Sequence, residues 1–103
     1  MLNLYCDMNN KIGIFSFFAG AGFLDLGFET TNHFQTLFVN ENHSAFAEIY
    51  RRSREKLNIV QPCFGIQIAD ITENLTNLHS LWLKENLIEA KKTHDLIGFI
   101  GGP

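Results

Sequence analysis

Short apolar runs alternate with segments of helical spacing along the whole chain. Each run is only a few residues long, is rich in aromatic and β-branched residues, and is typical of a strand buried on both faces. The runs predict strands at residues 12–18, 36–39, 64–68 and 96–100, and the segments between them predict helices at 23–31, 45–57 and 75–92. This alternation is typical of a parallel α/β sheet, here of about four strands and three helices with right-handed crossovers.

The composition is that of one small globular domain over residues 1–103. Hydrophobic residues make up 46% of the chain, which excludes a disordered tail or a low-complexity linker. Ten residues are phenylalanine, and those on the predicted strands and apolar helix faces are expected in the core. These core candidates are Phe15, Phe17, Phe28, Phe38, Phe46 and Phe64.

The helix predicted at 45–57 combines an apolar stripe with a basic face. Ser44 is a suitable N-cap, and the stripe consists of Phe46, Ile49, Tyr50 and Leu57. Residues 51–56 form a basic run that Glu55 interrupts, which we interpret as a solvated surface. Because the net charge of the chain is −3, a basic surface for gripping DNA is not expected within it.

The cysteines and histidines indicate no metal site. Cys6 and Cys63 lie far apart without CxxC spacing, and we interpret both as reduced thiols of a cytoplasmic protein. The four histidines are scattered, without the spacing that zinc ligands show. No apolar run approaches the roughly 20 residues that a membrane span needs, so we expect neither a metal nor a membrane partner.

Residues with useful chemistry follow the carboxyl end of every predicted strand, where parallel sheets bind ligands. They are Gly20 and Gly22, then Glu41, Asp70 and the pair at 101–102. Glycines let a ligand lie against the backbone at the start of a helix, and a carboxylate at the end of the second strand suits a ribose diol. Two simpler interpretations stay open: the glycines only form a turn, and Asp70 only caps the next helix.

An adenosine pocket of this kind fits two classes of ligand, dinucleotides and S-adenosylmethionine. The dinucleotide fingerprint requires a third glycine three residues after the second. This chain has Asp25 at that position. The pattern therefore favours S-adenosylmethionine.

Four sequence runs resemble motifs of the DNA cytosine-5 methyltransferases, in the order and spacing of that family. They are 15–29 (FSFFAGAGFLDLGFE), 39–42 (VNEN), 69–71 (ADI) and 95–103 (DLIGFIGGP). The resemblance covers nearly the whole chain. It implies the Rossmann-like parallel sheet of S-adenosylmethionine-dependent methyltransferases, in an incomplete form.

The resemblance also implies the cofactor and the residues that bind it. S-adenosylmethionine would lie on the glycine turn and would be held by the ends of the second and third strands, with Glu41 on the ribose and Asp70 and Ile71 on the adenine. The implied cofactor-binding residues are Phe18, Ala19, Gly20, Ala21, Gly22, Phe23, Glu41, Asn42, Asp70 and Ile71. Two of them depart from the common pattern: Phe23 stands where a glycine is frequent, and Asn42 where an apolar residue is frequent.

The resemblance assigns no catalytic residue to this chain. In the family a Pro-Cys loop that supplies the nucleophile follows the last of these motifs, whereas Cys6 and Cys63 match no such position. The chain is therefore expected to be inactive alone, with the target-recognition domain absent. Double-stranded DNA would be the substrate of the full enzyme, and a C-terminal half acting in trans is a possible partner. The alternatives are an inactive relic, an interaction module, or an α/β domain for another adenosine ligand.

Overall fold

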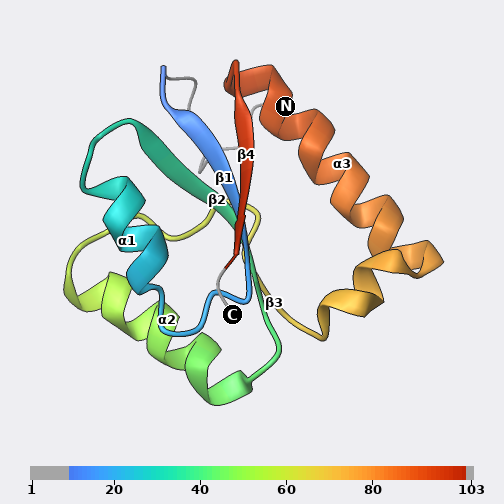
Figure 1. Cartoon of the computed structure of the whole chain (residues 1–103), viewed down its shortest axis with the longest axis horizontal. Helices are drawn as coiled ribbons and strands as arrows, with labels where there is room; N and C mark the ends of the chain where they lie inside the picture. The colour runs from blue at the N-terminus through green and yellow to red at the C-terminus, as the bar shows by residue number, and fades with distance from the viewer. Residues whose placement is uncertain (1–9, 102–103) are drawn as a thin grey trace.

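The protein is an all-parallel α/β sheet between two helical layers. The computed structural model describes residues 10–101, except the side chain of Asn77. The elements are β1 (Ile12–Phe17), α1 (Phe23–Glu29), β2 (Phe34–Glu41), α2 (Ser44–Lys56), β3 (Ile66–Ile68), the 3-10 helix η1 (Ile71–Leu75), α3 (Asn77–Thr93) and β4 (Ile97–Gly101). Helices α1 and α2 cover one face and α3 covers the other (Figure 1). The predicted fold class is confirmed.

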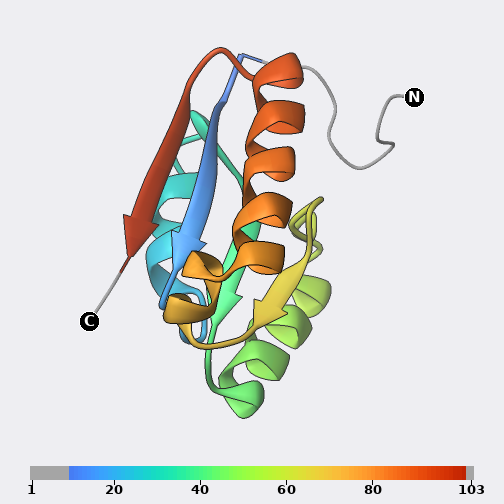
Figure 2. The same ribbon diagram turned by 90° about the vertical axis from the view of Figure 1, so that its right-hand side faces the viewer.

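The strand order brings the ends of the strands together. The sheet runs β3-β2-β1-β4 with every neighbouring pair parallel, and all four arrows point the same way in Figure 2. Phe17 at the end of β1 pairs with Asn40 on one side and Gly101 on the other. The turn after β1 and the residues after β2 and β3 therefore lie along one edge of the sheet.

Aromatic rings from both central strands form the core under α3. Phe15 and Phe38 are fully buried with ring centroids 5.3 Å apart, and the ring of Trp82 from α3 meets Phe38 edge-on at 5.2 Å. The predictions for Phe15 and Phe38 are confirmed. The prediction for Phe46 is wrong, because its side chain remains 46% exposed on the outer side of α2.

The inner face of α2 differs from the predicted apolar stripe. Its buried residues are Ala47, Tyr50 and Arg54, spaced three and four residues apart on one side of the helix. Of the predicted stripe, Ile49 and Leu57 are 47% and 59% exposed. The helix starts at Ser44 itself, and His43 occupies the N-cap position. The prediction from hydrophobic spacing is wrong here because Arg54, paired with Glu29, takes a buried position on the inner face. A pattern of apolar residues does not reveal a buried arginine.

Two further expectations need correction. Strand β2 is longer than predicted at both ends. At its carboxyl end polar side chains continue it, since Asn40 is buried and its amide nitrogen donates to the backbone oxygen of Ala69, 3.0 Å away. Cys63 is disulfide-bonded rather than a reduced thiol, since separation along the sequence does not limit which parts of a chain meet in space. Cys6 and Gly102 lie outside the described residues.

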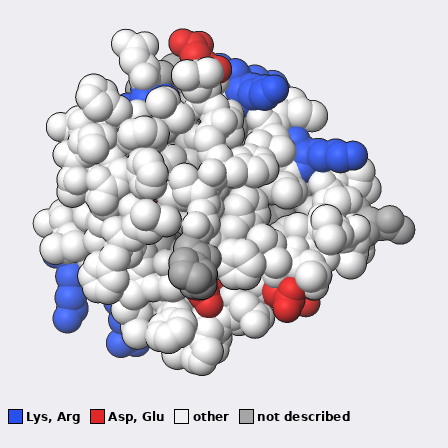
Figure 3. All heavy atoms as spheres, viewed as in Figure 1, with Lys and Arg blue, Asp and Glu red and all other residues white. Residues whose placement is uncertain are grey.

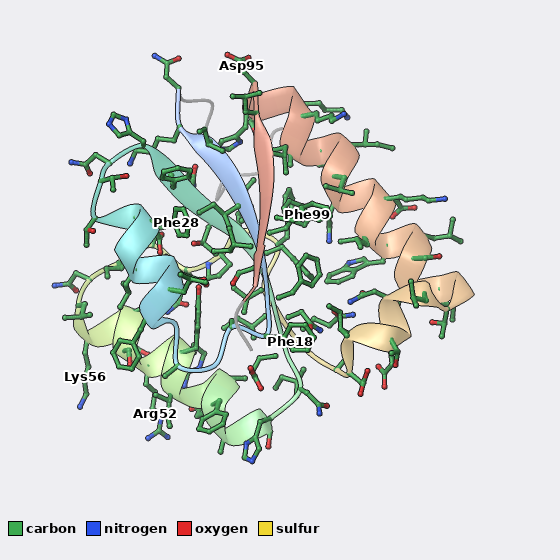
Figure 4. All side chains as sticks on the ribbon, in the orientation of Figure 1. Phe18, Phe28, Arg52, Lys56, Asp95 and Phe99 are labelled. Carbon is green, nitrogen blue, oxygen red and sulfur yellow. The ribbon has the colours of Figure 1, made fainter. Side chains whose placement is uncertain are left out.

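Strand β4 forms one edge of the sheet and leaves apolar surface open. Phe99 is 58% exposed although its ring stacks on Phe15 with centroids 5.7 Å apart. On the face shown in Figure 3, lysines and arginines lie towards the margins. Phe99 points from β4 towards α3 (Figure 4).

Acidification should destabilise the fold through His94, which lies buried just after α3. Burial lowers the pKa of His94 from its ordinary 6.5, and the ring nitrogens lie 2.8 Å from Thr93 Oγ1 and from Gln35 Oε1. Because the unfolded chain binds the proton more tightly, this stability is present above pH 6.5 and is lost as the pH falls.

The measurement is the melting temperature at about pH 7.5 and 5.5 for wild type and His94→Gln. We expect acidification to lower the melting temperature of the wild type more than that of His94→Gln, because glutamine keeps hydrogen-bonding capacity without titrating. Equal losses in both proteins would show that His94 does not contribute.

Candidate ligand-binding site at the glycine turn

The turn between β1 and α1 has a backbone conformation that few residues adopt. Phe18, Gly20 and Gly22 have positive φ angles of 55°, 57° and 93°. The Ala19 amide donates to the backbone oxygen of Asn40 (3.2 Å), and the Gly22 amide donates to Ala19 (3.0 Å). Residues 16–25 line a pocket of about 210 Å³ over this turn.

The two glycines serve different purposes. A Cβ atom added to Gly20 would meet nothing within 4 Å, so the space beside its Cα is open. A Cβ added to Gly22 would lie 2.7 Å from two ring carbons of Tyr50. Gly20 therefore leaves room for a ligand, whereas Gly22 allows the turn to pack against α2.

Glu41 at the end of β2 is joined directly to this turn. Its side chain is buried, and its Oε1 accepts from the Gly20 amide at 2.8 Å while Oε2 accepts from the His43 amide at 2.7 Å. Each carboxylate oxygen can accept more than one hydrogen bond. The predicted association of the glycine turn with this acid is thus present, and the carboxylate retains capacity for a ligand.

Asp70 is a cap, as the simpler interpretation of the sequence proposed, but it caps the 3-10 helix η1, and Thr76 is the N-cap of α3. Its Oδ1 accepts from the Thr72 amide at 2.8 Å and from the Thr72 hydroxyl at 2.6 Å. The hydroxyl bond, together with the amide bond, lowers the pKa of Asp70 below its ordinary range. Both bonds go to one oxygen of an exposed carboxylate, so the cap leaves Oδ2 available. Ile71 follows directly and is partly buried.

The remaining predicted residues lie around the same edge. Phe18 is 50% exposed at the lower end of the strands in Figure 4. Phe23, the first residue of α1, is 81% exposed, and Asn42 is also exposed. None of these three is needed to fill the core.

A buried polar cluster behind the turn was not predicted from the sequence. Asp25 is fully buried, and its two carboxylate oxygens accept from the hydroxyls of Ser16 (2.7 Å) and Tyr50 (2.5 Å). Burial raises the pKa of Asp25, against the opposing effect of these hydrogen bonds. Arg54 is bound to Glu29 through two hydrogen bonds of 2.7 Å and lies 5.4 Å from the centre of the Tyr50 ring.

Larger hollows lie away from this chemistry, and one of about 570 Å³ is lined only by the charged residues Arg51, Arg52, Glu55 and Lys56 of α2. The hollow between α3 and β4, of about 450 Å³, is lined by apolar side chains and two lysines. The hollow between α2 and β3, of about 320 Å³, contains Glu48 beside Arg51, which already form an ion pair of 2.7 Å. Size alone therefore does not select the functional site, and the glycine turn with its carboxylate remains the best candidate.

Residues 10–101 contain no group of three or more side chains suited to hold a metal ion. In the same part of the chain, no helix has the length and apolar character of a membrane span.

Comparison with known proteins finds two curated relatives. The chain is 44% identical over 93 residues to the type II methyltransferase M.NmeDI of Neisseria meningitidis serogroup C. These aligned residues cover 90% of this chain and 22% of that protein. It is 35% identical over 60 residues to the type II methyltransferase M.Bsp6I of Bacillus sp. (strain RFL6), covering 58% of this chain and 19% of that protein. The chain thus spans about a fifth of the length of these relatives. No family model and no solved structure matches it.

Proposed function

We propose that this chain is the S-adenosylmethionine-binding portion of a type II DNA methyltransferase of the restriction-modification kind, acting on carbon-5 of cytosine. Similarity to two proteins named type II methyltransferases supports the general activity. The observation that carries the cofactor assignment is the bond between the Gly20 amide and the buried Glu41 carboxylate. It joins the open glycine backbone to an acceptor suited to a ribose diol.

The residues present fit this cofactor. The open side of Gly20 gives a ligand access to the backbone, and Glu41 keeps acceptor capacity after its two backbone bonds. In this proposal Glu41 accepts from the ribose hydroxyls, and the turn from Phe18 to Gly22 lies against the methionine and adenosine portions. The exposed ring of Phe18 is available for apolar contact with the ligand.

The adenine would lie between the ends of β2 and β3. Asp70 would accept from the exocyclic amine through Oδ2, since its cap occupies Oδ1, and Ile71 would supply apolar contact. Asn42 and Phe23 border the same site. Asp25 stands where a dinucleotide fold has its third glycine and is committed to Ser16 and Tyr50, which favours S-adenosylmethionine over a dinucleotide.

The cofactor supplies an activated methyl group on a sulfonium centre. This chain's role is to bind and orient it, and the cysteine nucleophile and the reading of DNA sequence belong to other parts of the enzyme, supplied on the same chain or by a C-terminal half in trans. The basic residues of α2 are poor candidates for gripping DNA, because Arg51 and Arg52 are already paired with Glu48. Arg52 and Lys56 point into solvent in Figure 4.

For this DNA-directed activity we propose a location in the cytoplasm. The disulfide at Cys63 is the feature that this compartment does not favour, since thiols there are kept reduced.

Replacing Glu41 by alanine should weaken binding of S-adenosylmethionine about tenfold to a hundredfold. The reason is that a hydrogen bond to a charged group contributes about 1.5–3 kcal/mol. The measurement is calorimetric titration of S-adenosylmethionine, or of S-adenosylhomocysteine, into each protein. Glu48→Ala is the matched control, because Glu48 lies on the outer side of α2 and pairs with Arg51. Equal affinities of wild type and Glu41→Ala would remove this acid from the site, and no binding by wild type would refute the proposed cofactor.

A further inference from the structure

We propose that Tyr50 on α2 is a positioning residue that fixes the glycine turn in the shape that the cofactor requires. The proposal rests on the proposed function, since it concerns the same site. Tyr50 lies outside the four runs that resemble family motifs. Its ring lies against Gly22, whereas the space beside Gly20 is open.

The ring of Tyr50 determines how closely the turn approaches α2. An added Cβ on Gly22 would lie only 2.7 Å from Cδ2 and Cε2 of that ring, so the Gly22 backbone packs directly against the ring. Gly22 is itself buried. A flat, rigid side chain is therefore the surface against which the end of the turn packs.

The hydroxyl of Tyr50 fixes the orientation of this ring. It donates to Asp25 Oδ2, and Asp25 Oδ1 in turn accepts from Ser16 on β1. Tyr50 and Ser16 are each 1% exposed, and Asp25 is fully buried. The ring is thereby tied through α1 to the central strand.

Arg54 holds the same ring through its guanidinium group. Its Cζ lies 5.4 Å from the ring centre, within the range of a cation–π interaction. The guanidinium is fixed by two bonds to Glu29 at the end of α1 and by a 3.0 Å bond from Nε to the backbone oxygen of Val60. Tyr50 therefore has little freedom to tilt away from Gly22.

The turn thus has two separate anchors. The Glu41 carboxylate accepts from the Gly20 amide, and the Tyr50 ring packs against Gly22. Binding sites need their groups held within about 0.5 Å of the productive geometry. Loss of the Tyr50 ring should therefore weaken cofactor binding without removing any group that touches the cofactor.

The test compares two ring deletions of similar kind. Tyr50→Leu removes the ring under Gly22, and Phe28→Leu removes a ring that packs on Phe34 at the far end of α1, with centroids 4.9 Å apart. Titration of S-adenosylhomocysteine should show about tenfold weaker binding for Tyr50→Leu than for Phe28→Leu. Tyr50→Phe keeps the ring but loses the bond to Asp25, so it should bind more weakly than wild type and more tightly than Tyr50→Leu. Equal affinities of Tyr50→Leu and Phe28→Leu, or equal weakness of Tyr50→Phe and Tyr50→Leu, would overturn the proposal.

Amide hydrogen exchange separates this proposal from the cofactor assignment. The Gly20 and Gly22 amides both donate within the protein, so they should exchange slowly in wild type without ligand and faster in Tyr50→Leu, but not in Phe28→Leu. If wild type binds no cofactor and this difference remains, only the proposed function fails; unchanged exchange in Tyr50→Leu overturns the positioning role. Tyr50→Met, which fills the space without a flat ring, replaces Tyr50→Leu if that variant does not fold.

Discussion

Replacing Arg54 by alanine should lower the free energy of unfolding by about 3–5 kcal/mol, the usual cost of removing one partner of a buried ion pair. The Arg54 side chain is 3% exposed and that of Glu29 is 15% exposed. The substitution leaves the Glu29 carboxylate without its charged partner and removes the donors to the Val60 backbone oxygen. It also removes the cation beside the Tyr50 ring.

Urea denaturation of the purified variants measures this loss. Arg52→Ala is the control on the same helix: Arg52 is 69% exposed and pairs with Glu48 on the surface, so its removal should change stability by less than about 1 kcal/mol. If Arg54→Ala were as stable as Arg52→Ala, the pair between Arg54 and Glu29 would contribute nothing to the free energy of unfolding, which would contradict its buried position.

Replacing Gly22 by alanine should destabilise the protein by about 2–5 kcal/mol. The left-handed backbone costs an L-residue about 1–2 kcal/mol, and forcing a methyl group into a packed contact costs about 1–3 kcal/mol more. At Gly22 both apply, since φ is 93° and the new Cβ would lie 2.7 Å from the Tyr50 ring. Urea denaturation again gives the value.

Gly20→Ala is the comparison that isolates the steric part. Gly20 shares the left-handed conformation, with φ of 57°, but its added Cβ meets nothing, so only the backbone cost of about 1–2 kcal/mol should appear. The larger effect of Gly20→Ala should be on ligand affinity, because its methyl group would enter the open side of the turn. A larger stability loss in Gly20→Ala than in Gly22→Ala would contradict the packing described here.

The sequence was sufficient to predict the parallel α/β fold and the meeting of the glycine turn with Glu41. Both depend on local signals: short apolar runs, a glycine turn, and polar residues placed directly after strands. In a parallel sheet the carboxyl ends share one edge, so the position of Glu41 in the sequence already places it beside Gly20. Their 2.8 Å contact follows from that topology.

The layer behind the turn could not be predicted in the same way. Asp25 and Arg54 are ionisable residues, which a hydrophobic pattern assigns to the surface. Both are buried because distant residues form hydrogen bonds with them. In the sequence, Asp25 is informative only because it stands where a third glycine would be expected. The different purposes of Gly20 and Gly22 were also hidden, since Gly22 is required by a ring from another helix.

The measurement that tests the account most directly is the change in backbone amide signals of isotopically labelled protein as S-adenosylmethionine is added. We expect the largest changes on the turn at 18–22, on Glu41 and Asn42, and on Asp70 and Ile71. We expect little change in the hollow between α3 and β4, lined by residues such as Leu87 and Phe99. Saturable changes centred on that hollow, or no saturable change at the glycine turn, would contradict the account.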